Sequence, residues 1–260
     1  DNNVMSGLNG NDMIVGGAGN DTINGGGQDG DSGFGGEGDD TITEVGYGYG
    51  GAGSDTIGAR FHAEGGSGND TIYLSGNDAT ASGGDGNNVI RVYGKNSRVS
   101  AADGDDYVEI HKGGARVDVG GGNNTVEFGI PGNFLPAFEG SNIVTSGDGN
   151  DWIRFRYNES VTGTADLNII DAGGGNNRIY AGFGDYVITT GDGDDIISSG
   201  SNGEYTIQAG GGNNMISLGL GRNLVTAGAG NDTYSLLGTD TTINDAGGTN
   251  IVQASKDGIT

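Results

Sequence analysis

The feature that most constrains this chain is a short signature that recurs along almost its whole length. Each copy consists of a glycine, two residues that are mostly Asp or Asn, and a short run in which apolar and polar residues alternate. The third residue of the signature, here called the key residue, falls at Asp12, Asp21, Asp40, Asp55, Asp70, Asn88, Asp106, Asn124, Asp151, Asn177, Asp195, Asn214, Asp232 and Asn250. From Asp70 onward the spacing is 18 or 19 residues, apart from two spacings of 27 and 26. A fixed period of this kind predicts a repeat architecture in which each copy packs on its neighbours.

Each period of about 18 residues has room for two short strands. Between Asn214 and Gly230 they are MISL (215–218) and NLVTA (223–227), separated by turns that contain glycine. Both runs alternate apolar and polar residues, so one side of each strand can face inward. A helix is excluded, because glycine recurs every few residues and no stripe of period 3.6 exists. The pattern therefore predicts an all-β fold, a parallel β-solenoid with about 18 residues and two strands per coil, its coils stacked about 4.8 Å apart.

Composition limits how such a chain can be held together. Glycine supplies 59 of the 260 residues, and the formal net charge is −24. A chain this acidic and this poor in apolar residues buries little hydrocarbon, so something else must stabilise it. Cysteine is absent, which excludes disulfides. A polyanion repels nucleic acid and attracts cations, and no apolar run approaches the roughly 18 residues of a membrane span, so neither nucleic-acid binding nor membrane insertion is expected.

The first forty residues contain tighter copies. GLNGNDMIV (7–15), GGAGNDTIN (16–24) and FGGEGDDTI (34–42) resemble the RTX calcium-binding nonapeptide repeat. That resemblance implies a parallel β-roll with Ca²⁺ as cofactor, held by the key Asp and by turn carbonyls. The implied metal ligands are Asp12, Asp21, Asp40, Asp55, Asp70, Asp106, Asp151, Asp195 and Asp232. It also implies a secreted protein, at the cell surface or in the extracellular medium, exported by a type I-like route. We expect an RTX-like β-roll over 1–75 and a looser continuous solenoid over 76–260.

From Asp70 onward the key residue alternates between Asp and Asn without exception. Stacked carboxylates are costly without cations between them, whereas Asn amides are neutral. Two interpretations follow. Either Ca²⁺ occupies the Asp coils and amides fill the Asn coils, or the Asn side chains form a hydrogen-bonded amide ladder that stiffens the stack without metal. The residues of that ladder are Asn88, Asn124, Asn177, Asn214 and Asn250. After about residue 75 the second turn of each coil has no acid at a fixed place, so calcium is expected along one edge.

Two insertions, at 130–141 and 154–166, account for the long spacings. Both follow the first strand of a coil, so we expect them at the acid-poor edge, on consecutive coils and in contact. They are rich in aromatic and Arg residues, which favours an interface; a self-packed lobe is the alternative. The possible interface residues are Phe134, Leu135, Phe138, Arg154, Phe155, Arg156 and Tyr157.

No catalytic motif accompanies the repeats. The histidines, His62 and His111, lie in no zinc-hydrolase motif, and neither a nucleophile elbow nor a phosphate loop is present. We therefore predict no enzyme. The expected function is an extracellular calcium-stabilised structural solenoid of a filament, S-layer, sheath or adhesin. The alternatives are a calcium-binding folding or secretion module of a larger secreted protein and, more remotely, a ligand- or ice-binding face. The repeats run close to both ends of the chain. This is expected of a fragment or processed product, and it also predicts that the end coils of neighbouring chains can stack on one another.

Overall fold

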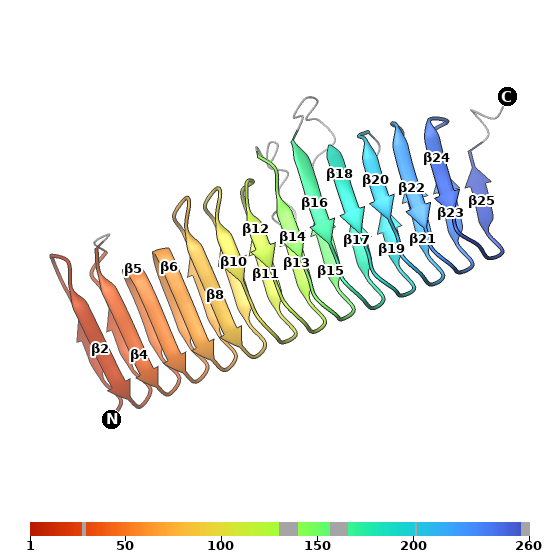
Figure 1. Ribbon diagram of the computed structural model, residues 1–260. Helices are drawn as coiled ribbons and strands as arrows, with labels where there is room; N and C mark the ends of the chain where they lie inside the picture. Colours follow the sequence, from red (N-terminus) through yellow and green to blue (C-terminus); the bar gives the residue numbers. More distant parts are fainter. Residues whose placement is uncertain (28–29, 130–139, 157–165, 201, 256–260) are drawn as a thin grey trace. The chain divides into compact units, whose positions relative to one another are not determined.

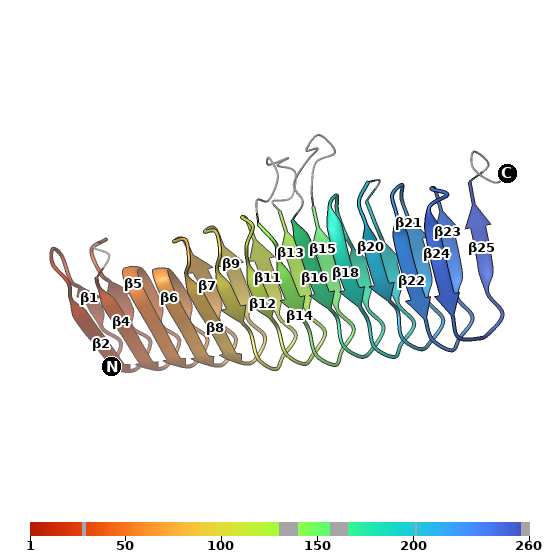
Figure 2. The same ribbon diagram turned by 45° about the horizontal axis from the view of Figure 1, so that its top comes forward.

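A computed structural model describes residues 1–27, 30–129, 140–156, 166–200 and 202–255. The chain forms two compact units, the first unit Asp1–Gly121 and the second unit Gly122–Thr260. The boundary expected near residue 75 concerns the regularity of the repeats and stays a prediction. Every regular element in the described ranges is a β-strand. Figures 1 and 2 show the strands of each unit side by side, coil after coil.

The first unit contains the strands that precede residue 122. They are β1 (Val4–Ser6), β2 (Met13–Ala18), β3 (Thr22–Asn24), β4 (Ser32–Glu37), β5 (Thr41–Ala52), β6 (Thr56–Ser67), β7 (Thr71–Leu74), β8 (Thr80–Asp85), β9 (Val89–Val92), β10 (Arg98–Ser100), β11 (Tyr107–Ile110) and β12 (Arg116–Asp118). Strands β5 and β6 are each 12 residues long and continue from one wall of the coil to the other, with an irregular register between them.

The second unit has two separate strands in almost every coil. They are β13 (Thr125–Phe128), β14 (Ile143–Thr145), β15 (Trp152–Phe155), β16 (Leu167–Asp171), β17 (Arg178–Tyr180), β18 (Asp185–Thr189), β19 (Ile196–Ser198), β20 (Tyr205–Gln208), β21 (Met215–Leu218), β22 (Asn223–Ala227), β23 (Thr233–Leu236), β24 (Thr241–Asp245) and β25 (Ile251–Ala254). The two strands expected at 215–218 and 223–227 coincide with β21 and β22.

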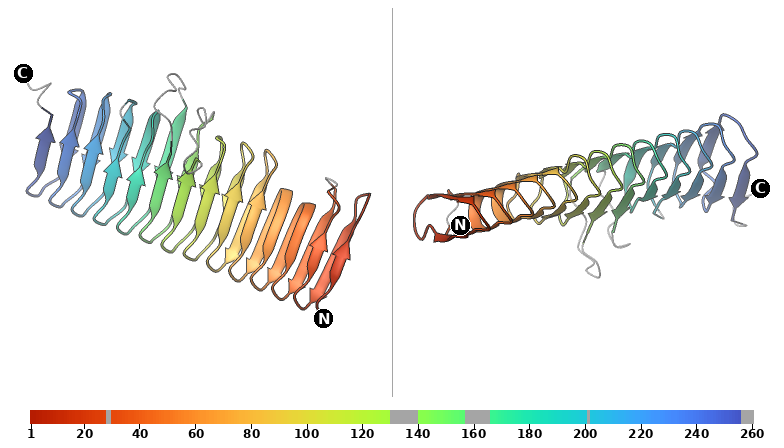
Figure 3. Two further views of the ribbon diagram at one scale, coloured as in Figure 1. Left: turned by 180° about the vertical axis from the view of Figure 1, so that it is seen from behind. Right: turned by 90° about the horizontal axis from the view of Figure 1, so that it is seen from below.

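All the strand pairs within each unit are parallel and join one coil to the next. In the second unit, for example, β19 pairs with β21 and β21 with β23, while β20 pairs with β22. Figure 3 shows these coils from behind and from below, with the two walls linked by turns. Both units are therefore parallel β-solenoids, which confirms the predicted fold class.

The core of each unit consists of columns of buried, mostly aliphatic side chains, and each coil contributes one residue to a column. In the first unit Ile23, Ile42, Ile57, Ile72 and Ile90 occupy equivalent register positions and are fully buried. In the second unit the equivalent column runs from Val126 to Tyr234. A coil this thin buries only a few apolar residues, for example Ile72 and Leu74 from β7, so the turns must supply much of the remaining stability.

Candidate metal-binding turns

Within each unit the key residues lie in the turns along one edge of the coils. In the first unit this edge carries Asp21, Asp40, Asp55, Asp70, Asn88 and Asp106, and in the second unit Asn124, Asp151, Asn177, Asp195, Asn214, Asp232 and Asn250. All of them except Asn250 are at most 2% exposed. We number each turn so that the key residue is position 6. In the turn of Asp70, for instance, Gly65 is position 1, Gly66 position 2 and Gly68 position 4.

Glycine at positions 2 and 4 is required by the backbone. Gly66 and Gly68 have φ values of 115° and 123°, a region that favours glycine. A Cβ at either one would also lie 2.0 Å from the carbonyl oxygen of the preceding coil. These glycines therefore let consecutive turns stack closely enough for their polar groups to meet.

A buried ladder of hydrogen bonds connects the key residues. Within each unit the backbone N–H of a key residue donates to the side-chain Oδ1 of the key residue one coil further on. In the first unit Asp40 donates to Asp55 at 2.7 Å, Asp55 to Asp70 at 2.8 Å and Asp70 to Asn88 at 3.0 Å. The second unit repeats this from Asn124 to Asn250. The ladder expected of Asn alone therefore runs through Asp and Asn alike, because both supply an Oδ1 acceptor.

A second ladder, formed by the exposed residue at position 5, runs in the opposite direction. The N–H of Asp39 donates to Oδ1 of Asn20 on the preceding coil at 3.1 Å, and the N–H of Ser54 donates to Asp39 at 2.8 Å. In the second unit Asn176 donates to Asn150, and Asp194 to Asn176, both at 2.7 Å. The two consecutive Asx residues of the signature thus have separate structural roles, one buried and one exposed.

Asp and Asn differ at the second side-chain atom. Oδ2 is buried and has no hydrogen-bond partner in Asp12, Asp21, Asp40, Asp55, Asp70, Asp151, Asp195 and Asp232. The Nδ2 of Asn88, in contrast, donates to the carbonyl oxygens of Gly84 at 3.1 Å, Gly86 at 3.0 Å and Ala101 at 3.4 Å. A buried carboxylate oxygen without a donor is costly, so the Asp turns lack one favourable partner that the Asn turns possess.

The glycine at position 1 makes room for this oxygen in the early coils. A Cβ on Gly65 would lie 2.2 Å from Oδ2 of Asp70 and 2.5 Å from the carbonyl oxygen of Gly83 on the next coil. The same pair of close oxygens, one from the key carboxylate and one from the next coil, is found at Gly16, Gly35 and Gly50. A carboxylate oxygen and a backbone carbonyl oxygen therefore crowd the same glycine in each of these turns.

Burial raises the pKa of several key carboxyl groups. The pKa of Asp55 is raised to about 6 by desolvation, against the hydrogen bond from the Asp40 backbone and with added repulsion from the Asp70 and Asp40 carboxylates. Desolvation also raises the pKa of Asp106 to about 6, although hydrogen bonds from Asn88 oppose it. The pKa values of Asp40, Asp70, Asp151 and Asp195 are raised as well, in each case mainly by burial. Burial therefore disfavours the charged form of these carboxyl groups.

These turns fit a calcium ion. Among the described residues no three Asp, Glu, His or Cys side chains gather into a cluster, so most ligands must be backbone carbonyls. Ca²⁺ takes six to eight oxygen ligands, and carboxylate and carbonyl oxygens are the types it prefers. The partnerless Oδ2 atoms and the neighbouring turn carbonyls provide both types of oxygen.

Asp12 does not belong to the stack of key residues that begins at Asp21. It lies half a coil before Asp21, at the opposite edge, where its N–H donates to Oδ1 of Asp31 at 2.8 Å. Asp31 is fully buried, and the sequence analysis missed it because QDGD (28–31) departs from the spacing of the signature. The first coils of the first unit therefore carry buried Asp residues at both edges.

Turns of the second unit differ at position 1. There Ser146 and Thr190 replace glycine, and their hydroxyl groups donate to the carbonyl oxygens of Ala172 at 3.2 Å and Ala209 at 3.0 Å. Each acceptor is position 1 of the next coil, the equivalent of Gly83 beside Asp70. These hydroxyl groups also act on the key carboxylates of their own turns, because hydrogen bonds from Ser146 and Thr190 oppose the rise in the pKa of Asp151 and Asp195.

The possible interface residues fall into three groups. Phe155 belongs to β15 and is buried, stacked on Phe128 with ring centroids 4.2 Å apart, so it is a core residue and the expectation of an interface role is wrong. Arg154 lies in the same strand and is half-buried, and Arg156 forms an ion pair with the buried Glu127. Phe134, Leu135, Phe138 and Tyr157 lie outside the described residues, as does the predicted contact between the insertions.

One polar cluster on the outer face of the first unit was also missed. Glu109 on β11 is 7% exposed and pairs with Arg91 Nε and His111 Nε2, both at 3.1 Å. Desolvation lowers the pKa of His111, while the Glu109 carboxylate opposes that shift. The guanidinium of Arg91 also lies over the rings of Tyr73 and Tyr107. This cluster ties three successive coils together.

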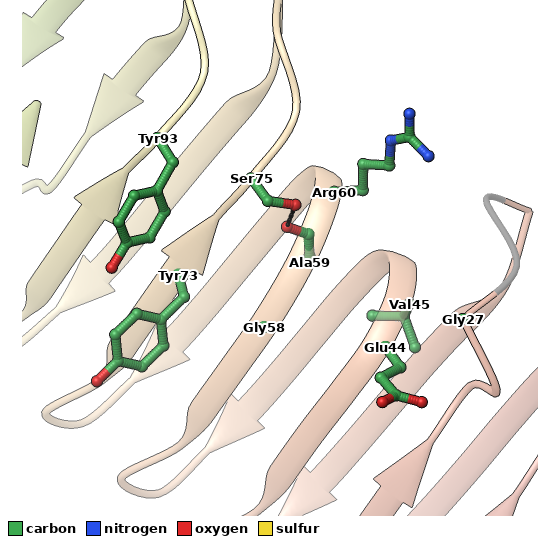
Figure 4. Close-up of a pocket in the computed structure, with 9 residues that line it drawn as sticks. All are labelled: Gly27, Glu44, Val45, Gly58, Ala59, Arg60, Tyr73, Ser75 and Tyr93. Atoms are coloured by element: carbon green, nitrogen blue, oxygen red, sulfur yellow. Dashed lines mark hydrogen bonds between the residues drawn. The ribbon is translucent and has the colours of Figure 1, made fainter. Parts of the chain in front are cut away.

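A shallow groove of about 450 Å³ lies beside this cluster. Its walls include Tyr73 and Tyr93, whose rings point the same way in Figure 4, while Arg60 extends away from them. Gly58 opens the floor, since a Cβ there would meet nothing closer than 3.9 Å. Glu44 is the one carboxylate among the lining residues, so the groove offers no pair of carboxyl groups for acid–base chemistry.

Comparison with known proteins adds the family. The chain matches the family model of the RTX calcium-binding nonapeptide repeat (4 copies) over residues 1–31, 62–79, 82–109, 137–154, 155–188, 187–203 and 206–234, which is well over half its length. No curated protein and no solved structure matches it. Among the described residues no helix is long and apolar enough to cross a membrane. The repeat model, the parallel solenoids and the stacked glycine–Asx turns agree, and the chain belongs to the family of RTX calcium-binding nonapeptide repeats.

Proposed function

We propose that this chain is an extracellular structural solenoid whose coils are stabilised by calcium, as part of a cell-surface, filament or adhesin assembly. Membership of the repeat family makes the chain a calcium-binding structural repeat domain. The observation that carries the proposal further is the set of buried Oδ2 atoms without a hydrogen-bond partner in the consecutive Asp turns of the first unit, among them those of Asp40, Asp55 and Asp70. The Asp residues of these turns and the adjacent turn carbonyls would hold Ca²⁺, and the bound ion would supply the positive charge that the stacked carboxylates need.

Charge supports an extracellular setting. The chain carries a formal net charge of −24, and its key carboxylates repel one another in consecutive coils. Metal binding of this kind is coupled to folding, because the ligands come together only in the folded coil. Extracellular calcium-binding modules work at about 10⁻⁴ to 10⁻³ M calcium. A chain that stays expanded at low intracellular calcium and folds outside the cell suits secretion without disulfides.

Sedimentation velocity in EGTA and in millimolar calcium tests this function. We expect a slow, expanded species in EGTA and, with calcium, conversion to large assemblies formed by stacked coils or through the insertions. A compact monomer in calcium would instead favour the alternative, a folding or secretion module of a larger secreted protein. A species that is equally compact in EGTA and in calcium would refute the calcium requirement altogether.

A further inference from the structure

The Asn turns contain a hydrogen-bond donor that the Asp turns lack, the side-chain amide nitrogen Nδ2 of the key residue. Nδ2 of Asn88 donates to the carbonyls of positions 2 and 4 of its own turn and of position 1 of the next turn. Nδ2 of Asn177 donates to the same two carbonyls of its own turn, Gly173 at 3.3 Å and Gly175 at 3.2 Å. Asn124 and Asn214 keep the bond to position 4, at 3.1 and 3.4 Å. One amide nitrogen thus lies among several carbonyl oxygens from one or two coils.

In the Asp turns an acceptor takes the place of that donor. Oδ2 of Asp70 and the carbonyl oxygen of Gly83 approach the same point beside Gly65, and neither oxygen carries a hydrogen. Two acceptor oxygens that both lie within 2.5 Å of one point, without a proton or a cation between them, repel. What stabilises the Asp turn must therefore bring positive charge, whereas the Asn turn already contains two N–H groups with partial positive charge.

We propose that the Asn amide nitrogen takes the place of the calcium ion, so that Asn turns hold their shape without metal and only Asp turns bind it. This inference rests on the proposed calcium-dependent function. The choice of Asp or Asn at position 6 then sets, turn by turn, how many ions the chain binds. Because Oδ1 is common to both residues, the buried ladder continues through either kind of turn.

The rule gives the two units different calcium requirements. Four consecutive coils of the first unit carry Asp, from Asp21 to Asp70, without an Asn turn between them. In the second unit Asp151, Asp195 and Asp232 each lie between two Asn turns, and the hydroxyl groups of Ser146 and Thr190 add further donors. Calcium dependence is therefore concentrated in the first unit.

Exchange of single residues tests the rule on the full chain. The variants are Asp70→Asn, Asn88→Asp and, as a matched control, Asn87→Asp. The control adds the same charge one residue away, at an exposed position whose Oδ1 acceptor is kept. Calcium bound per chain is measured by equilibrium dialysis at saturating calcium, and the fold by circular dichroism with and without EGTA. We expect one ion fewer for Asp70→Asn, one more for Asn88→Asp and no change for Asn87→Asp.

The folding measurement separates the outcomes. Asp70→Asn is expected to retain more β-structure in EGTA than the unaltered chain, and Asn88→Asp to retain less until calcium is restored. An unaltered chain that binds no calcium would overturn the proposed function itself. An unaltered chain that binds calcium, combined with unchanged stoichiometry in both Asp70→Asn and Asn88→Asp, would overturn the exchange rule alone.

Discussion

Mild acid is expected to stabilise the calcium-free protein, whereas ordinary proteins lose stability as their carboxylates are protonated. The reason lies in the buried key carboxyl groups, whose protonated form can donate from the second oxygen as an Asn amide does. In the metal-free fold the pKa of Asp55 is raised to about 6, from an ordinary value of about 3.9 in an unfolded chain. The folded state therefore binds more protons than the unfolded state between these two values.

The magnitude follows from the shift. A change of about 2 pKa units corresponds to about 3 kcal/mol, since one unit is 1.36 kcal/mol. For Asp55 this stabilisation is fully present below pH 4 and is lost as the pH rises through 6. Asp106, with a pKa also raised to about 6, contributes in the same window. We therefore expect the free energy of unfolding of the metal-free protein to rise by several kcal/mol between pH 7.5 and pH 4.5.

Circular dichroism of the calcium-depleted chain at four pH values across this range measures the effect, with urea unfolding at each pH where the chain is folded. The variant Asp55→Asn removes one titrating group from the buried edge and should flatten the pH dependence. Its control, Asp39→Asn, removes the same charge from an exposed position of the adjacent coil and keeps the Oδ1 acceptor. Any stabilisation that arises only from the reduction of net charge would be altered equally by both variants.

With calcium present the sign reverses, because protons compete with the ion for the same oxygens. Acidification below pH 6 should then weaken calcium binding and lower the calcium-dependent part of the stability. Metal-free stability that falls steadily from pH 7.5 to 4.5, or an Asp55→Asn profile identical to that of Asp39→Asn, would refute the argument that buried carboxyl groups control this behaviour.

Three further outcomes follow from packing and from the distribution of turns. Gly65→Ala places a methyl group against two oxygens and is expected to cost about 1–3 kcal/mol in urea unfolding. Gly58→Ala, whose methyl group would meet nothing closer than 3.9 Å, should change stability by less than about 1 kcal/mol. Phe155→Ala removes a ring stacked on Phe128 and should cost about 3–5 kcal/mol, whereas a surface role would leave stability unchanged. Calcium removal should increase amide hydrogen exchange more in the first unit than in the second, and equal increases in both would contradict the uneven calcium requirement.

The coil architecture could be predicted because it depends on local pattern. Glycine at fixed intervals defines the turns, and alternation of period 2 defines which side of each strand faces inward. That is why the strands expected at 215–218 and 223–227 coincide with β21 and β22. The burial of the key residues follows from the same periodicity, since each lies in the turn where consecutive coils meet.

Each coil has a turn at either edge, and the spacing of the signature along the sequence does not reveal in which of the two turns a key residue lies. Asp12 and Asp21 share one signature but occupy opposite edges, nine residues being half a coil. Asp31 could not be predicted because it departs from the regular spacing of the signature. In the structure its Oδ1 nevertheless accepts a hydrogen bond from the Asp12 backbone N–H. Phe155 looked like part of an insertion, although the strand extends through it and turns its ring inward.

By itself, the sequence determined the repeat, its two strands per coil, the glycine positions and the alternation of Asp with Asn, because these are properties of neighbouring residues. Only the tertiary structure decided what the alternation does. The difference between Oδ2 and Nδ2 matters because carbonyl oxygens of the same turn and of the next coil surround that atom. These groups come together only when consecutive coils stack, and the proposed rule follows from their meeting: a cation at the Asp turn and an amide at the Asn turn.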